Sequence, residues 1–172
     1  MRKGQRSVMN YSAVFRMLGY VLQFEAGFLL LPCIVALIYR EKSGFAYLIM
    51  AAACFVIGFG LSRIKGKSKN FFAKEGFVSV ALSWIVMSLV GCMPFIISGE
   101  IPKFIDALFE TVSGFTTTGA SIVNDVTTLS HSTLFWRSFS HWIGGMGILV
   151  FILIFIPESN EGSSMHLLRA ES

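Results

Sequence analysis

A run of three threonines followed by a glycine, in the stretch SGFTTTGASI at residues 113–122, is the part of this sequence best suited to chemistry. β-Branched threonine is a poor helix former, so the run interrupts helical sequence. An extended Thr116–Thr118 segment would present a ladder of backbone carbonyls with hydroxyls beside them. Gly119 can adopt a positive φ, which lets successive carbonyls face the same way. Because rings of carbonyls replace the hydration shell of an ion in potassium filters, the run predicts an ion-selectivity filter; a Thr-rich surface loop is the alternative.

The composition predicts a membrane protein. Of 172 residues, 54% are hydrophobic, whereas only 14 are Lys or Arg and 10 are Asp or Glu. A spanning helix needs about 20 apolar residues, and four segments meet this need, at residues 17–39, 44–61, 76–98 and 133–156. The three cysteines lie inside these segments at spacings that suit neither a metal site nor a disulfide framework, so we expect buried thiols. The sequence therefore predicts an all-α integral membrane fold.

Residues 102–114 lie between the third and fourth segments and predict a short helix with Pro102 in its first turn. Apolar side chains recur there at helical spacing, at Phe104, Ile105, Leu108, Phe109 and Val112. Its length of roughly 20 Å cannot cross a hydrocarbon core of about 30 Å. The helix either lies on the outer surface or is a re-entrant pore helix that stops midway. In the second case its negative C-terminal end would favour a cation, and the threonines would line an aqueous path.

Basic residues are concentrated on one side of the predicted helices. Four precede the first segment, and five more separate the second from the third: Arg2, Lys3, Arg6 and Arg16, then Arg63, Lys65, Lys67, Lys69 and Lys74. By the positive-inside rule, both termini should be cytoplasmic. The same rule explains the net charge of +4, so no nucleic-acid partner is expected.

The stretch FIDALFETVSGFTTTGASIV, followed by FWRSFSHWIGGMGILVF, resembles the first pore repeat of the Trk/Ktr/HKT superfamily of potassium transporters. Members are built from units of helix, pore helix, filter and helix. The two leading apolar segments resemble the additional helix pair of the TrkH and TrkG branch. The resemblance implies a helix pair with a basic loop at residues 1–74, a pore repeat at 75–157 and a cytoplasmic connector at 158–172. It also implies potassium uptake across the plasma (inner) membrane, in contact with membrane lipid.

The resemblance also implies roles for single residues. Thr117 and Thr118 match the positions whose carbonyls bind potassium, Gly119 matches the filter glycine, and Thr116 and Ala120 flank them. In the plant branch a serine at the filter glycine accompanies sodium transport, so Gly119 favours potassium. Potassium is then the transported ion, with no organic cofactor expected. A cytoplasmic, nucleotide-binding TrkA-type gating protein is the implied partner, and the full-length transporter can form a homodimer.

The sequence departs from the family in holding one repeat where members carry four. A truncated transporter is the main interpretation, and a homotetrameric cation channel of single repeats is the alternative. A non-transporting scaffold or regulatory subunit with a degenerate pore unit is the rival from another functional class. An enzyme is not expected, because the histidines show no metalloprotease pattern.

Several charged, polar and small residues lie inside the apolar segments and need a structural explanation. A lone Arg137 in a membrane helix is costly, so we expect it to bond to Glu110 or to carbonyls at the end of the pore helix, which would support the filter. The alternative is that Arg137 extends to the outer surface. Glu25 is expected to serve the structure, by snorkelling or by pairing with a basic residue. His141 is expected to be a hydrogen-bonded packing residue. Gly144, Gly145 and Gly147 should permit close helix packing behind the filter, or a bend.

Overall fold

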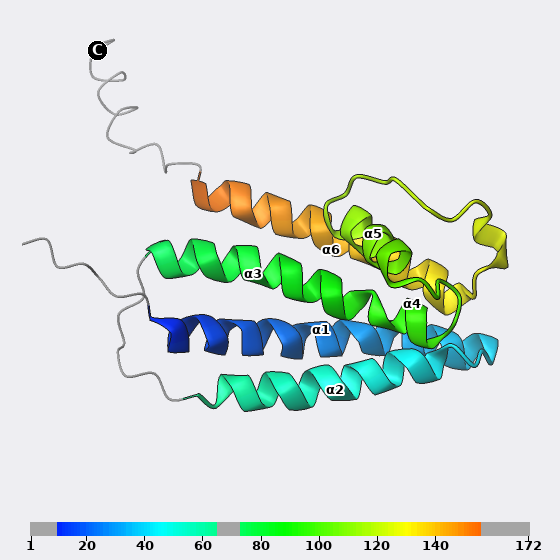
Figure 1. Cartoon of the computed structure of the whole chain (residues 1–172), viewed down its shortest axis with the longest axis horizontal. Coiled ribbons are helices and arrows are strands. Elements are labelled where there is room, and N and C mark those ends of the chain that lie inside the picture. The colour runs from blue at the N-terminus through cyan, green and yellow to red at the C-terminus, as the bar shows by residue number, and fades with distance from the viewer. Residues whose placement is uncertain (1–9, 65–72, 156–172) are drawn as a thin grey trace, which may run out of the picture.

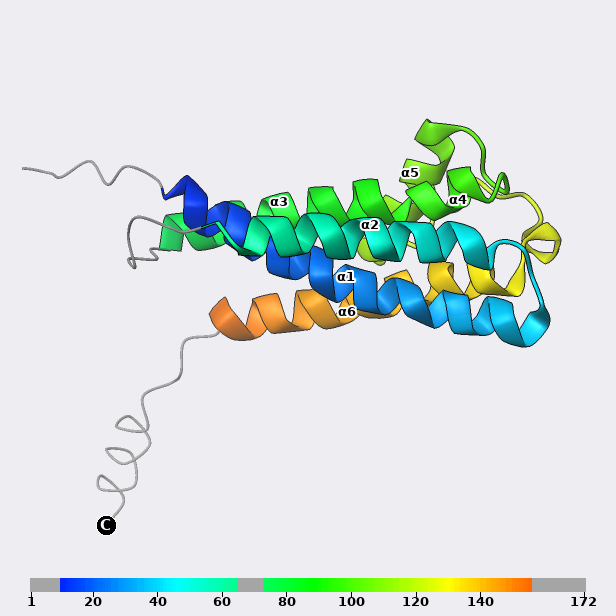
Figure 2. The ribbon, with the colours of Figure 1, turned by 90° about the horizontal axis from the view of Figure 1, so that it is seen from below.

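The computed structural model describes residues 10–64 and 73–155, and every regular element in those ranges is a helix. The long helices are α1 (Tyr11–Tyr39), α2 (Gly44–Ser62), α3 (Ala73–Gly91) and α6 (His131–Phe155); the short ones are α4 (Met93–Ile97), α5 (Phe104–Phe115) and the 3-10 turn η1 (Val126–Thr128). The long helices run side by side, and α5 packs obliquely against α3 and α6 (Figures 1 and 2). The predicted all-α fold is confirmed.

The helices α1 and α2 form an antiparallel hairpin whose crossing depends on two glycines. A Cβ on Gly19 would lie 2.6 Å from the backbone nitrogen of Ser62, and one on Gly58 would lie 2.7 Å from the Gly19 carbonyl oxygen. The first helix begins at Tyr11 rather than at residue 17, because Asn10 caps it by accepting a hydrogen bond from the Ala13 N–H. Arg16, predicted to precede this helix, therefore lies within it.

The third predicted segment is broken near its end, between α3 and α4. Pro94 lies in the first turn of α4 and lacks an N–H, so it cannot continue the bonding pattern of α3. The break exposes the carbonyl of Gly91, which accepts a 2.9 Å hydrogen bond from the Trp136 indole N–H. This bond ties α6 to the end of α3.

The predicted pore helix is present as α5, a helix of 12 residues or about 18 Å. Pro102 lies outside it, contrary to the prediction, because Lys103 is extended (φ −82°, ψ 124°) and the helix begins only at Phe104. From Thr116 the chain returns as a loop to the end of the bundle where α6 begins (Figure 1). The segment therefore enters and leaves at the same end of the bundle.

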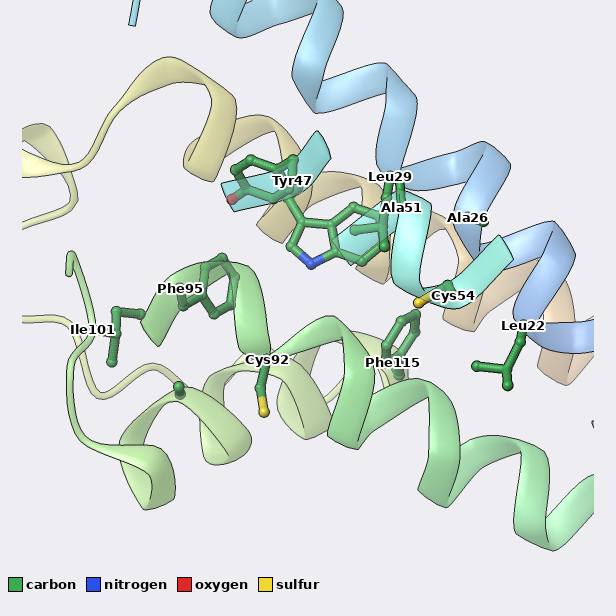
Figure 3. Close-up of a cluster of buried hydrophobic side chains, with 12 residues drawn as sticks. Leu22, Ala26, Leu29, Tyr47, Ala51, Cys54, Cys92, Phe95, Ile101 and Phe115 are labelled. Atoms are coloured by element: carbon green, nitrogen blue, oxygen red, sulfur yellow. The ribbon is translucent and has the colours of Figure 1, made fainter. Parts of the chain in front are cut away.

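A core of buried side chains joins the hairpin to the remaining helices (Figure 3). The hairpin contributes Leu22, Ala26, Leu29, Tyr47, Ala51 and Cys54, and the rest comes from Cys92, Phe95, Ile101, Ala107, Phe115 and Trp136. Tyr47 and Trp136 are fully buried and meet edge to face, with ring centroids 6.4 Å apart. The thiols of Cys54 and Cys92 are free and buried as predicted, whereas Cys33 is half-buried.

Three helices are long and apolar enough to cross a membrane, by length and composition: Tyr11–Tyr39, Gly44–Ser62 and Glu75–Ile97, the last joining α3 to α4. Only the described residues enter this comparison. The predicted fourth segment coincides with the 25-residue α6, which is not among the three; its first half carries Arg137 and His141. Large apolar side chains on the hairpin face outward, as lipid contact requires, with Phe24 70% exposed and Phe45 73% exposed.

Several sequence-based expectations fall outside the described residues. They concern the basic residues at positions 2, 3, 6, 65, 67 and 69 and the connector at 158–172. Within the described ranges, the starts of α1 and α3 and the ends of α2 and α6 share one end of the bundle (Figure 1). The α1–α2 connection and the start of α6 lie at the other end.

Candidate ion-binding site

A left-handed turn centred on Thr117 closes the C-terminal end of α5. Thr117 has φ +57°, and its N–H donates to the Gly114 carbonyl at 2.9 Å. The Thr118 N–H donates to the Ser113 carbonyl at 3.0 Å. These two bonds form a Schellman motif, in which glycine usually takes the left-handed position. Placing an L-residue there costs about 1–2 kcal/mol, and strain of this kind concentrates at functional sites.

The turn leaves three consecutive carbonyls without a partner in the part of the chain that the structure describes. The Thr116 carbonyl accepts a bond from Thr117 Oγ1 at 2.7 Å, and the Ala120 carbonyl accepts one from Ser113 Oγ. Between these two, the carbonyls of Thr117, Thr118 and Gly119 accept no hydrogen bond from any residue that the structure describes. Residues 116–120 are all exposed. The free carbonyls thus follow directly on the end of α5, whose partial negative charge favours a cation.

The predicted extended conformation is wrong at the start of the threonine run. Thr116 is right-handed helical (φ −84°, ψ 0°) and Thr117 is left-handed. A right-handed residue followed by a left-handed one turns successive N–H groups to one side. Here the N–H groups of Thr117 and Thr118 both face the carbonyls at the end of α5. Gly119 has the expected positive φ, at +77°, and no atom lies within 4 Å of the Cβ that another residue would place there.

Glu110 on α5 holds the chain that leaves the site. Its buried carboxylate accepts bonds from Ser121 Oγ at 3.1 Å and from the Ile122 N–H at 3.1 Å. Together with the bond from Ser113 to Ala120, these contacts fix the exit of the loop against the side of α5. The free carbonyls therefore lie in a segment that is anchored at both ends.

Arg137 on α6 completes this anchor. Its Nε donates to Glu110 Oε1 at 2.7 Å, and its terminal nitrogen contacts the same oxygen and Ser121 Oγ. The side chain of Arg137 is 15% exposed and that of Glu110 is 3% exposed. The contact expected between these residues is therefore present, and Arg137 does not extend to the surface. A buried pair of this kind is costly to break, because the remaining charge is left uncompensated.

Glycines bring α5 and α6 into backbone contact behind the turn. A Cβ on Gly144 would clash with the Phe115 carbonyl, and one on Gly114 would clash with Ser140 Oγ. By contrast, the Cβ of a residue at Gly145 would meet nothing closer than the Thr117 methyl group at 3.9 Å. Close packing behind the predicted filter, one of the two roles foreseen for these glycines, is present at Gly144.

His141 has the kind of contact that was expected of it, whereas Glu25 does not. His141 uses its ring Nδ1–H to bond the Arg137 carbonyl at 2.9 Å, as a packing residue would. Glu25 neither snorkels nor pairs: it is 1% exposed, and neither carboxyl oxygen has a partner among the described residues. Neither of the two contacts foreseen for Glu25 is present, because α1 starts earlier than expected and places Glu25 halfway along a 29-residue helix.

Sequence reasoning missed the serines that anchor the loop. Ser113 and Ser121 lie in the quoted stretch, yet their partners depend on how the loop folds back over α5. It also missed Glu41, which bonds the first turn of α6 from a position 90 residues away. A contact of that separation leaves no periodic signal in one sequence.

Comparison with known proteins supports the architecture. The family model described as "Cation transport protein", TrkH, matches residues 43–172. The Trk system potassium uptake protein TrkH of Salmonella typhimurium is 40% identical over 169 residues, 95% of this chain and 34% of that protein. The protein TrkG of Escherichia coli is 38% identical over 146 residues, 84% of this chain and 30% of that protein.

A solved structure also resembles this chain. The crystal structure of the potassium transporter TrkH from Vibrio parahaemolyticus matches with a TM-score of 0.79 and 30% identity, over 90% of this chain and 34% of that one. This chain thus spans about a third of the length of the relatives it matches. The family model covers most of the chain, and the chain belongs to the TrkH cation transport protein family.

Proposed function

We propose that this chain forms one pore unit of a potassium-uptake transporter, in which the carbonyls of Thr117, Thr118 and Gly119 bind K⁺. The observation that carries the proposal is a set of three consecutive carbonyls beyond the C-terminal end of α5 that accept no hydrogen bond from any described residue. Carbonyls can replace the hydration shell of a potassium ion. The relatives named as potassium uptake proteins give further support.

Thr116 and Ala120 flank this proposed ion site, and their carbonyls are held by side-chain hydroxyls. Glu110 and Arg137 support it from behind. In this proposal the protein accelerates permeation by replacing ion hydration. Gly119, rather than serine, favours potassium over sodium.

One unit surrounds an ion on one side only, so we propose that further pore units complete the site. The share of the relatives that this chain spans, about a third, supports completion within a longer chain. Four copies of this chain around one axis would supply the same number of filters by symmetry and are the second candidate. A scaffold or regulatory role is weakened by the strained turn at Thr117, which a non-transporting unit would not need to keep.

We propose the remaining roles from the resemblance to the family. We propose that residues 1–74 form a peripheral helix pair, 75–157 the pore unit and 158–172 a connector. The protein lies in the plasma membrane with a cytoplasmic N-terminus. A TrkA-type cytoplasmic protein gates the complete transporter, which assembles as a dimer.

Growth of potassium-uptake-deficient cells at low potassium tests this function. The complete coding sequence that contains these residues should restore growth, and the 172-residue chain by itself should not. Robust rescue by the 172-residue chain, together with a tetramer on crosslinking, would favour the homotetramer. Failure of the complete protein to raise potassium uptake would contradict the proposal.

A further inference from the structure

The loop between α1 and α2 caps the first turn of α6. Glu41 lies in that loop and accepts hydrogen bonds from the backbone N–H groups of His131 at 2.7 Å and Ser132 at 3.0 Å. The His131 ring adds a third bond at 2.8 Å, in which Nδ1 donates because a carboxylate only accepts. The same ring stacks on Tyr39, with centroids 4.0 Å apart. Since the first N–H groups of a helix have no partner within it, Glu41 satisfies two of them from outside.

Two further hydrogen bonds extend this junction into the core. Ser43 and Ser132 share a 2.7 Å bond between their hydroxyls. Deeper, the Tyr47 hydroxyl lies 2.9 Å from Thr133 Oγ1, and both side chains are fully buried. The hairpin therefore holds the start of α6 through polar contacts. These contacts fix the position of α6 along its own axis, whereas apolar packing alone would let the helix slide.

The helix α6 connects this junction to the proposed ion site. One of its faces meets the hairpin, where Trp136 contacts Tyr47 and Phe139 contacts Phe28 edge to face at 5.5 Å. Arg137 lies on the neighbouring face, six residues after His131 or roughly 9 Å along the axis. A displacement of the first turn would therefore be passed along a rigid helix to the bond between Arg137 and Glu110.

We propose that Glu41 is a positioning residue for the ion filter: by capping α6 from the peripheral hairpin, it sets the position of Arg137 and thus of the loop anchored on Glu110. This inference rests on the potassium-uptake function proposed above. It gives the hairpin, which contributes no residue to the filter, a direct mechanical part in ion selection.

The test uses the complete transporter containing these residues, with Glu41→Gln as the main variant and Asp125→Asn as the matched control. Asp125 is also an acidic residue of this end of the bundle, and its carboxylate caps η1 by accepting the Thr127 N–H at 2.9 Å. The control thus removes the same charge from a comparable capping side chain, away from α6. Hydrogen exchange is measured at residues 120–123 and 131–135, along with the KM for potassium and the potassium-to-sodium uptake ratio.

We expect Glu41→Gln to exchange faster in both segments, to raise the KM for potassium about fivefold, as loss of one hydrogen bond would, and to lower the uptake ratio. Glu41→Asp should recover part of each effect, and Asp125→Asn should match the wild type. Faster exchange confined to residues 131–135, with unchanged KM and uptake ratio, would make Glu41 a structural cap only and overturn the proposal.

The experiment also covers a variant that does not fold and a wild type that takes up no potassium. If Glu41→Gln does not fold, Glu41→Asp is measured in its place, and unchanged exchange at residues 120–123 then contradicts the coupling. If the wild-type protein takes up no potassium, the proposed function fails, whereas the exchange arm still tests the coupling between the two segments.

Discussion

Arg137 and Glu110 form a buried ion pair, with Arg137 Nε 2.7 Å from Glu110 Oε1, and both side chains also contact Ser121. The pair joins α6 to α5 at the level where the chain leaves the proposed filter. Through this pair, the position of α6 determines where the loop at Ser121 lies against α5.

Arg137→Gln and Glu110→Gln should each destabilise the complete protein by about 3–5 kcal/mol, because each leaves an uncompensated buried charge. The double variant should be damaged less than the sum of the two, with a coupling of about 0.5–3 kcal/mol. Thermal unfolding in detergent measures the stability, and potassium uptake is followed in parallel. Strict additivity would show that the direct contact contributes nothing.

Gly144→Ala should be destabilising by about 1–3 kcal/mol, because the added methyl group clashes with the Phe115 carbonyl at the end of α5. Gly145→Ala is the matched control, since its methyl group would only reach ordinary contact with Thr117 at 3.9 Å. The two unfolding temperatures are compared. Equal effects would mean that α5 and α6 are not in backbone contact at Gly144.

Thr117→Gly should raise the stability by about 1 kcal/mol, because glycine adopts the left-handed conformation without the penalty of a Cβ. It should also lower the potassium-to-sodium ratio, since the turn becomes less rigid. Thr117→Val, which keeps the β-branched strain and loses the bond to the Thr116 carbonyl, is the control. A glycine variant no more stable than the valine variant would contradict the strained turn.

Gly119→Ser should reduce potassium preference and ease sodium passage. The effect is conformational, since the added Cβ meets no atom within 4 Å but φ is +77°. Gly60→Ser is the control: its Cβ also meets nothing, and its φ is not positive. An unchanged uptake ratio in the Gly119 variant would remove Gly119 from the filter.

Acidification should loosen the start of α6 through Glu41. Burial raises the pKa of Glu41, but the hydrogen bonds from Ser132 and His131 together lower it by more. The pKa of Glu41 therefore lies below its ordinary value. The stabilisation is therefore complete above the ordinary carboxyl pKa of about 4.3 and is lost as the pH falls through the lower value of the folded protein. Glu100, which accepts a bond from the Ser130 N–H, is the neighbouring acidic group at this junction.

Thermal unfolding followed between neutral and acidic pH measures this loss. The wild type should lose more stability on acidification than Glu41→Gln, which has no group to protonate at this position. Glu100→Gln serves as the comparison, because it leaves Glu41 in place. Parallel curves for the wild type and Glu41→Gln would assign the acid sensitivity to another group.

The sequence predicted the fold well because hydrophobic length is a strong signal in membrane proteins. It located α2 to within a residue, and it foresaw a short helix ending just before Thr116. The helix ends were less predictable where local capping decided them, as Asn10 does for α1 and Pro94 does at the break after α3.

The site was predictable in composition but not in conformation. Glycine signalled a positive φ at Gly119, whereas nothing in a threonine signals the left-handed turn that Thr117 adopts. That turn arises because the α5 carbonyls of Ser113 and Gly114 need donors at the helix end. The contact from Arg137 to Glu110 could be inferred from the cost of an unpaired charge, but the serines sharing it could not.

Locating the bound ion tests the proposed filter most directly. Crystals of the complete transporter grown with thallium, a monovalent mimic of potassium, give an anomalous signal at the ion position. We expect a peak coordinated by the carbonyls of Thr117, Thr118 and Gly119, and we expect its loss in Gly119→Ser but not in Gly60→Ser. A pore peak held by other residues, with none beside these three carbonyls, would contradict it.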